Sequence, residues 1–161
     1  MNRRSMLTLI TTAVAWLWIA LAASNAVAQP AADVEGVKAA SKAFYAALAV
    51  IDDGQAMDEV VAHSSYITIV GPLSRSITVR YDAWKKYWAD ANEQQSLRTI
   101  SLSEQLIHVN GNLAYEMGQE SGTLKLKDGR EIKIAAIVTN VYEKIDGRWL
   151  MISHHAQAKP Q

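Results

Sequence analysis

The sequence predicts an α+β domain in which helices come first and a long antiparallel meander comes last. Three turn signals recur at intervals of 18 residues, at Asn110-Gly111, Asp128-Gly129 and Asp146-Gly147. Such dipeptides between apolar runs are typical of tight hairpins, because the favoured turns need residues with positive φ. The spacing leaves room for four long strands, predicted at about 98–109, 112–127, 130–145 and 148–157.

The N-terminal half carries helical periodicity. Apolar side chains recur at helical spacing in three segments, at 31–51, about 56–62 and 80–93. Two β-branched segments predict short strands, at 66–70 and 76–79. Helices followed by a meander predict a curved sheet with about three helices packed on one face.

The segment Ile134–Val138 is apolar at every position, which predicts that both faces of the sheet are covered there. Polar residues also occur at the depth of the strands, namely Glu116, Asn140, His154 and His155. A polar group away from water needs a partner or a wet cavity. The pattern therefore predicts a pocket between the sheet and the helices, and an apolar patch on the outer face.

Residues 1–28 have the organisation of a secretory signal. A basic start with Arg3 and Arg4 precedes an apolar run, and Ala26-Val27-Ala28 matches an A-x-A cleavage site. An uncleaved membrane anchor is the alternative, because the apolar run approaches the length of a span. We expect cleavage after Ala28, by Sec or twin-arginine export, and a single periplasmic or secreted domain at 29–161 that meets the membrane only through this signal.

Composition excludes several classes of function. The chain has no cysteine, which excludes thiol chemistry and disulfides. Its 16 Lys and Arg balance 16 Asp and Glu, so there is no basic excess for nucleic acid. It has no Gly-rich phosphate loop, and its histidines lack a metal-ligand spacing. We therefore predict no cofactor and no metal, and a small molecule as the partner.

With these elements in order, the chain resembles the nuclear transport factor 2-like superfamily and, within it, the SnoaL-like (ketosteroid-isomerase-like) domains. The motifs lie in the helix at 44–48, at Ile69-Val70-Gly71-Pro72, and from 138 through Asp146-Gly147-Arg148-Trp149 to His155. The ending is also similar to the association domain of calcium/calmodulin-dependent kinase II. The resemblance covers nearly all of 32–157, and implies a cone with a pocket at its open end and a homodimer through the outer sheet face.

The same resemblance implies three catalytic positions known from steroid isomerases, and the chain fills none of them. The base position falls at Gly71, and the oxyanion-hole positions fall at Phe44, next to Tyr45, and at Thr139. Neither Gly nor Phe can move or donate a proton there. This argues against a steroid isomerase and leaves open whether the protein is an enzyme.

His155 and Glu116 are the candidate general acid/base residues. Neighbours on a strand point to opposite faces, so His154 and His155 cannot share one metal, and the family pattern favours His155 as the residue in the pocket. A purely structural histidine is the alternative, as are solvated carboxylates for Glu116 and Glu120. The predicted ligand-binding residues are Tyr45, Tyr66, Trp84, Trp88, Tyr115, Asn140, His154 and His155.

The sequence thus favours an exported SnoaL-like protein that binds a small, largely apolar organic molecule. Two alternatives remain: an isomerase, dehydratase or hydrolase type of enzyme with a His or Glu acid/base, and an oligomerisation module without catalytic role. Asn140 and His155 are expected near the same end of the sheet, on adjacent strands. Whether they share a face depends on the register, because one β-bulge would change it.

Overall fold

The computed structural model describes residues 31–52 and 54–160. The predicted signal segment lies outside the described residues and stays a prediction. The chain divides into two compact units, and the fold belongs to the second, Val34–Gln161. None of the helices in the described ranges has the length and apolarity that a membrane span requires.

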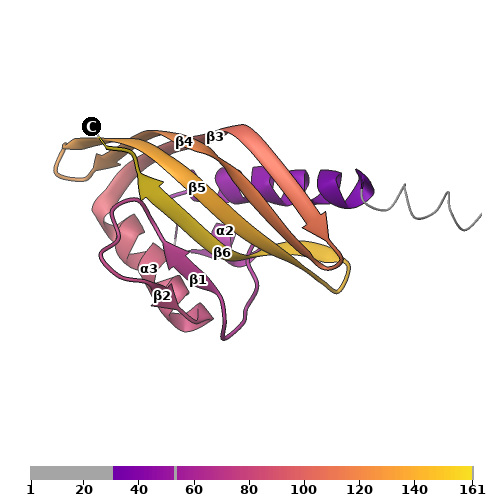
Figure 1. The fold of residues 1–161 in the computed structure, drawn as a ribbon. Helices are drawn as coiled ribbons and strands as arrows, with labels where there is room; N and C mark the ends of the chain where they lie inside the picture. The colour runs from indigo at the N-terminus through magenta and orange to yellow at the C-terminus, as the bar shows by residue number, and fades with distance from the viewer. Residues whose placement is uncertain (1–30, 53, 161) are drawn as a thin grey trace, which may run out of the picture. The chain divides into compact units, whose positions relative to one another are not determined.

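The elements follow the predicted order, with helices and short strands before the meander (Figure 1). A helix includes residues 31–48 and precedes the short α2, Gln55–Asp58. Strands β1, Thr68–Val70, and β2, Thr78–Val79, lead into α3, Tyr81–Gln94. The meander consists of β3, Gln95–Asn110, β4, Leu113–Leu126, β5, Glu131–Ile145, and β6, Arg148–Ala158. Its strand ends lie within three residues of the predicted ones.

The described strands form one curved six-stranded sheet in the order β2-β1-β6-β5-β4-β3. Strand β1 runs parallel to β6, and the other pairs are antiparallel. The helix at 31–48 and α3 lie on the same side of the long strands (Figure 1). The predicted α+β class, with helices on one face of a curved antiparallel sheet, is confirmed.

The hairpin that joins β5 to β6 has the predicted turn. Asp146 has a φ of 50° and Gly147 a φ of 79°, so both central residues are left-handed as a type I′ turn requires. The turn between β3 and β4 is displaced by one residue from the prediction. Asn110 still pairs with Leu113, and the two loop residues are therefore Gly111 and Asn112.

The main core lies between the inner sheet face and the helices. It is built from Phe44 and Leu48 of the first helix, Trp84 and Trp88 of α3, and strand residues such as Tyr142 and Met151. Along β5 every second side chain from Ile134 to Tyr142 is buried. In the single chain the apolar run at 134–138 is covered on its inner face, while Ile137 on the outer face is 51% exposed. The outer face thus carries the expected apolar patch, and its covering by a partner stays a prediction.

A β-bulge in β6 decides which histidine faces inward. Tyr142 pairs with Met151 and Val141 pairs with Ser153, so β6 contains one extra residue at this point. The extra residue reverses the alternation in the rest of the strand. Asn140 therefore lies opposite His154, and Thr139 lies opposite His155. His154 is buried and His155 is exposed, so the expectation that His155 joins Asn140 on the pocket face is wrong.

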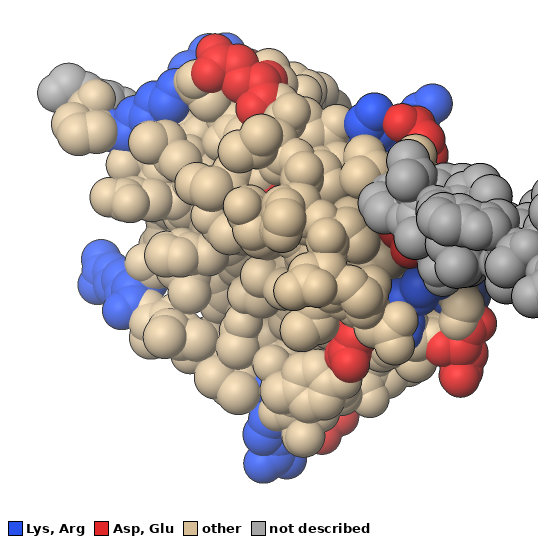
Figure 2. Space-filling model, turned by 45° about the vertical axis from the view of Figure 1, so that its right-hand side comes forward, with Lys and Arg blue, Asp and Glu red and all other residues tan. Residues whose placement is uncertain are grey.

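Charged side chains are spread over the margins of the face drawn in Figure 2, and Lys and Arg form no patch at its centre. A nucleic-acid interface would need basic side chains clustered on one face. The face drawn in Figure 2 shows no such cluster at its centre.

Candidate functional site

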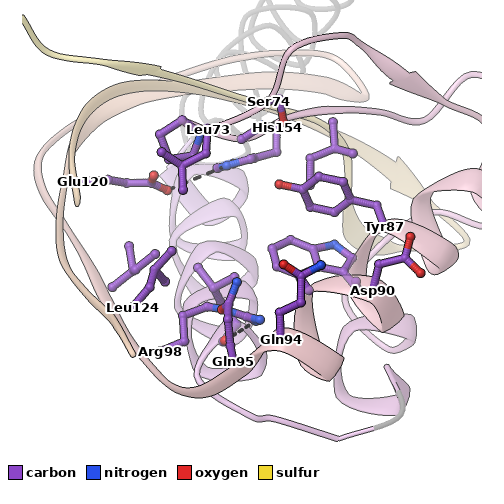
Figure 3. Close-up of a pocket in the computed structure, with 17 residues that line it drawn as sticks. Leu73, Ser74, Tyr87, Asp90, Gln94, Gln95, Arg98, Glu120, Leu124 and His154 are labelled. Atoms are coloured by element: carbon purple, nitrogen blue, oxygen red, sulfur yellow. Dashed lines mark hydrogen bonds and ion pairs between the residues drawn. The ribbon is translucent and has the colours of Figure 1, made fainter. Parts of the chain in front are cut away.

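A pocket of about 360 Å³ opens between α3, the loop after β1 and the inner face of the sheet (Figure 3). Its apolar walls come from the first helix, β1, α3, β3 and β4, through Leu48, Ile69, Trp88, Ile100 and Leu124. Ionisable side chains also line it: Arg98 on β3, Glu120 on β4 and His154 on β6 lie deep in it, and Tyr87 and Asp90 of α3 complete the set. An apolar cavity with a few converging polar groups is the usual form of a small-molecule site.

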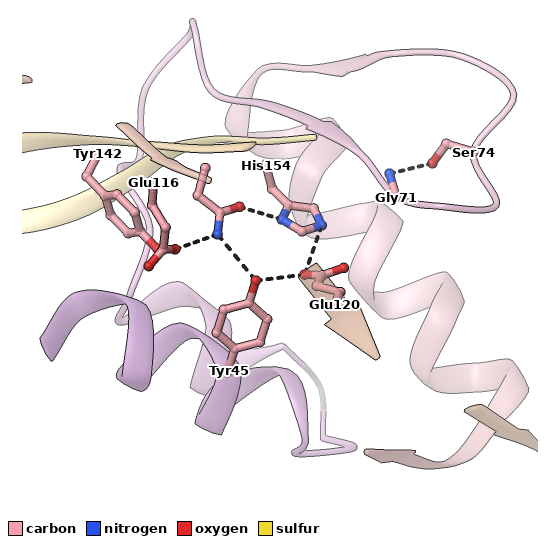
Figure 4. Close-up of polar contacts among 8 residues, drawn as sticks. Tyr45, Gly71, Ser74, Glu116, Glu120, Tyr142 and His154 are labelled. Carbon is pink, nitrogen blue, oxygen red and sulfur yellow. Dashed lines mark hydrogen bonds and ion pairs between the residues drawn. The ribbon is translucent and has the colours of Figure 1, made fainter. Parts of the chain in front are cut away.

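The polar groups at the inner end of the pocket belong to a hydrogen-bonded network (Figure 4). The Glu116 carboxylate accepts hydrogen bonds from Asn140 Nδ2 at 2.8 Å and the Tyr142 hydroxyl at 3.0 Å, and a further one from Gln105. These donors explain how a carboxylate with no exposed surface is tolerated. Glu116 thus holds the amide of Asn140 in place and lies behind the pocket wall rather than in the pocket.

Asn140 in turn determines the tautomer of His154. Because its amide nitrogen donates to Glu116, its Oδ1 is the atom that faces His154 Nδ1, at 2.8 Å. An amide oxygen can only accept, so Nδ1 carries the proton and donates it. Burial lowers the pKa of His154 to about 4, and the neighbouring His155 adds to this effect. The imidazole is therefore neutral near pH 7, and its Nε2 presents a lone pair.

Glu120 is the buried carboxylate that reaches the pocket. Its Oε1 accepts a hydrogen bond of 2.8 Å from the Tyr45 hydroxyl and lies 4.0 Å from His154 Nε2. Within residues 31–52 and 54–160, its Oε2 accepts no hydrogen bond. Burial raises the pKa of Glu120 to about 6, the Tyr45 hydrogen bond lowers it, and the charge of Glu116 raises it.

Tyr45 connects the two carboxylates. It donates to Glu120 and accepts a hydrogen bond of 3.3 Å from Asn140 Nδ2. Burial, followed by the nearby Glu120 charge, raises the pKa of Tyr45 well above its ordinary value. Burial and the charge of Glu116 do the same to the pKa of Tyr142. Both phenols therefore stay protonated and act as hydrogen-bond donors.

Gly71, the position that the resemblance to steroid isomerases assigns to their base, lines the pocket. A Cβ added there would overlap the hydroxyl of Tyr87 from α3. Tyr87 thus occupies the space that a side chain at position 71 would need. Its hydroxyl faces the same space as His154 and Glu120 (Figure 3). A larger side chain at position 71 would therefore require Tyr87 to move.

Arg98 lies at the other end of the pocket from Glu120 and His154, beside Gln95 (Figure 3). Its side chain is buried and lies over the Trp88 ring, 4.8 Å from the ring centroid. It donates to the Leu48 carbonyl at 2.8 Å, to Asn92 Oδ1 at 2.7 Å and to Gln95 Oε1 at 2.9 Å. Burial lowers its pKa to about 10, so the guanidinium is charged at neutral pH.

Several of the predicted site residues meet in this region. Trp88 and His154 line the pocket, whereas Tyr45, Glu116 and Asn140 belong to the network behind them. The others lie elsewhere. Trp84 is buried in the core, and Tyr66 is exposed and hydrogen-bonded to Glu143. The Tyr115 ring lies tilted beside His108 on the outer sheet face, and His155 is exposed.

Sequence reasoning missed Arg98 and Tyr87, and it treated Glu120 only as a companion of Glu116. The signal for Glu120 was available, because residues 116 and 120 share one strand face. No such signal existed for Arg98, which is the fourth residue of β3, shortly after the end of α3. Among the described residues, no group of His, Asp and Glu could hold a metal ion.

The comparisons with solved structures show the same fold at low identity. One is a protein from Streptomyces avermitilis, provisionally assigned as a dehydratase of the nuclear transport factor 2-like family. Its sequence is 20% identical and its TM-score is 0.72, and the alignment covers 82% of this chain and 100% of the other. A superfamily member from Salmonella enterica is 17% identical with a TM-score of 0.71, covering 79% of this chain and 91% of its own.

A third structure, from Xanthomonas campestris, is provisionally assigned as a calcium/calmodulin-dependent protein kinase II association domain. It is 23% identical with a TM-score of 0.64, covering 78% of this chain and 86% of its own. No curated protein matches the chain. The family model of the SnoaL-like domain matches residues 37–157, which is most of the chain and includes the whole pocket and network. The chain therefore belongs to the SnoaL-like domain family.

Proposed function

We propose that this protein binds a small, largely apolar organic molecule in the pocket and transfers a proton on it, with Glu120 as the general base. One observation carries this proposal. Glu120 is a buried carboxylate whose Oε1 is held by Tyr45 and whose Oε2 accepts no hydrogen bond from any described residue, in a pocket with apolar walls. A general base needs a free lone pair within reach of a bound molecule.

The acidities support this assignment. With a pKa of about 6, Glu120 is mostly ionised at pH 7 and still basic enough to take up a proton. Glu116 has donors on its carboxylate and lies behind Asn140, so it serves as a positioning residue. His154 offers a neutral Nε2 that can accept a hydrogen bond from a ligand hydroxyl.

The chemistry follows from these roles. Glu120 Oε2 takes a proton from a C–H or O–H group of the bound molecule, and the electron pair of that bond moves into the molecule. The Tyr87 hydroxyl, which faces the same space, can donate to the oxygen on which negative charge then develops. The protonated Glu120 returns its proton either to another carbon, which is an isomerisation, or to a leaving hydroxyl, which is a dehydration.

Deuterium uptake tests this proposal without knowledge of the natural substrate. The protein is incubated in D₂O with a panel of small cyclic ketones and aromatic β-hydroxy ketones, and products are read by mass spectrometry. We expect deuterium at carbon or loss of water for at least one compound, with the rate rising with pH through about 6. Glu120→Gln should abolish this activity. Glu131→Gln, on the exposed start of β5, is the matched control and should retain it.

Binding without catalysis is the second candidate, favoured by the apolar walls around Trp88 and Leu124. Compounds of the panel that bind in calorimetry but never take up deuterium would support this candidate and would refute general-base catalysis by Glu120.

We further propose that the protein forms a homodimer through the outer sheet face. Large apolar side chains are exposed there, including Leu106, Tyr115, Met117 and Ile137. An exposed apolar face of this kind often marks a protein interface. The likeness to a structure provisionally assigned as an association domain supports the proposal. Sedimentation velocity on the purified protein should give a dimer, and a stable monomer would contradict it.

Export is the remaining proposal. The basic start, the apolar run and the Ala26-Val27-Ala28 site support cleavage after Ala28 and a periplasmic or secreted protein. Intact-mass measurement of the exported protein should give a chain that begins at Gln29. A mass that retains residues 1–28 would instead indicate an anchored form.

A further inference from the structure

The guanidinium of Arg98 is a buried charge without a counter-ion among the described residues. It is 2% exposed, and its three hydrogen-bond partners are a main-chain carbonyl and the side-chain amides of Asn92 and Gln95. All three are neutral, and no carboxylate of residues 31–52 and 54–160 lies within ion-pair distance. A buried charge is normally paired, because neutral hydrogen bonds replace only part of its hydration.

The nearby acidic groups do not fill this role. Asp52 acts on Arg98 only at longer range, and its two carboxylate oxygens accept hydrogen bonds from the main-chain N–H groups of Gly54 and Ala56. Asp90, at the pocket edge, forms an exposed ion pair with Lys86. Within residues 31–52 and 54–160, the positive charge of Arg98 is therefore not neutralised by an ion pair.

The guanidinium keeps unused donors. It has five N–H groups, and three are engaged, one each on Nε, Nη1 and Nη2. Among the described residues, one N–H on each of Nη1 and Nη2 therefore has no acceptor, on a side chain that lines the pocket. Two N–H groups on a planar guanidinium match the two oxygens of a carboxylate.

We propose that the molecule bound in this pocket carries a carboxylate group, which pairs with Arg98, on an apolar or aromatic body. The body lies against Trp88 and Leu124, and the end remote from the carboxylate meets Glu120 and His154. Charge fixes this orientation, because the ionised Glu120 repels an anion and Arg98 attracts it. The inference deepens the proposed function and rests on it, since it names the class of molecule on which Glu120 acts.

A matched pair of probes tests the inference on the full-length protein. The probes are 2-naphthoate and its neutral counterpart 2-naphthamide, which have the same ring system and nearly the same shape. Binding is measured by isothermal titration calorimetry at pH 7.5, with quenching of tryptophan fluorescence as a second readout. A hydrogen-bonded ion pair away from water should make naphthoate bind at least about tenfold more tightly than naphthamide.

Variants locate the preference at Arg98. Arg98→Gln should bind both probes equally, and Arg98→Lys should keep part of the preference because it keeps the charge. Arg130→Gln, at the exposed turn before β5, is the matched control and should behave like the parent. If circular dichroism shows that Arg98→Gln does not fold, the ratio of the two affinities is compared among the parent, Arg98→Lys and Arg130→Gln. A preference for naphthoate that falls in Arg98→Lys and not in Arg130→Gln still assigns it to Arg98.

Each other outcome has a definite meaning. Equal affinity of the parent for both probes would overturn the carboxylate preference and leave the pocket and the Glu120 proposal intact. A preference lost equally in Arg130→Gln would place the effect in the overall charge and also overturn it. Failure of the parent to bind either probe would count against both this inference and the proposed function.

Discussion

Replacing Glu120 by Gln should abolish proton transfer and at the same time stabilise the folded protein. The carboxylate is 2% exposed, and in the described part of the chain its one hydrogen bond comes from Tyr45. Gln has nearly the same shape and keeps an oxygen that can accept this bond. The substitution therefore removes the negative charge while leaving the packing and the hydrogen bond in place.

The size and the pH dependence of the stabilisation follow from the pKa. Burial raises the pKa of Glu120 from 4.5 to about 6, so ionisation is less favourable in the folded than in the unfolded chain. Below pH 4.5 both states are protonated and there is no penalty. As the pH rises to 6 the folded state loses about 2 kcal/mol relative to the unfolded state, and above pH 6 the loss is constant.

Urea denaturation of the parent and of Glu120→Gln at pH 4 and pH 8 measures the effect. At pH 8 the variant should be about 2 kcal/mol more stable, and at pH 4 the two should agree. Glu131→Gln, a control on the exposed start of β5, should show neither effect beyond about 0.5 kcal/mol. A Glu120→Gln protein that is less stable than the parent at pH 8 would show that the ionised carboxylate is stabilised by its surroundings, and the reasoning would be wrong.

Three further predictions use other parts of the site. Burial lowers the folded-state pKa of His154 from 6.5 to about 4, so the neutral imidazole contributes its full stability above pH 6.5 and loses it as the pH falls. Between pH 7 and pH 4, the free energy of unfolding of the parent should therefore fall by about 3 kcal/mol more than that of His154→Gln. Urea titrations at the two pH values measure this difference. Gly71→Ala should displace the Tyr87 hydroxyl and weaken binding of 2-naphthoate several-fold in calorimetry, and adding Tyr87→Phe should restore it, because the overlapping oxygen is gone. Ile137→Lys, at a half-exposed position on the outer sheet face, should give a folded monomer in sedimentation velocity; a variant that stays dimeric would place the interface elsewhere.

The sequence did not predict that His154, and not His155, faces inward. An unbroken β6 would have placed His155 on the inner face, since the residues that pair across the hairpin would each shift by one. The bulge before Ser153 inserts one residue and exchanges the roles of the two histidines. A β-bulge bends the strand at the expense of one pairing, and neither residue of Ile152-Ser153 is a sequence signal for a bulge.

The sequence could place Glu120 on the same strand face as Glu116, but it could not show which of the two acts as the base. Period-two alternation already placed Glu116 and Glu120 on one face. Which of them has a free oxygen depends on their partners, and these come from distant segments. Gln105, Asn140 and Tyr142 donate hydrogen bonds to Glu116, whereas Tyr45 is the only described residue that donates one to Glu120. A pairing across 75 residues of chain cannot be derived from local pattern.

The sequence by itself determined the order of the elements, the lengths of the four long strands and the turn at Asp146-Gly147. These depend on local rules, namely the period of apolar side chains and the backbone conformations that single residues allow. The tertiary structure decided the rest of the site: the inward His154, the free oxygen of Glu120, and the buried charge of Arg98 between the end of α3 and the first helix. Burial, pKa and hydrogen-bond partnership depend on which segments meet in space, and only the folded chain brings these segments together.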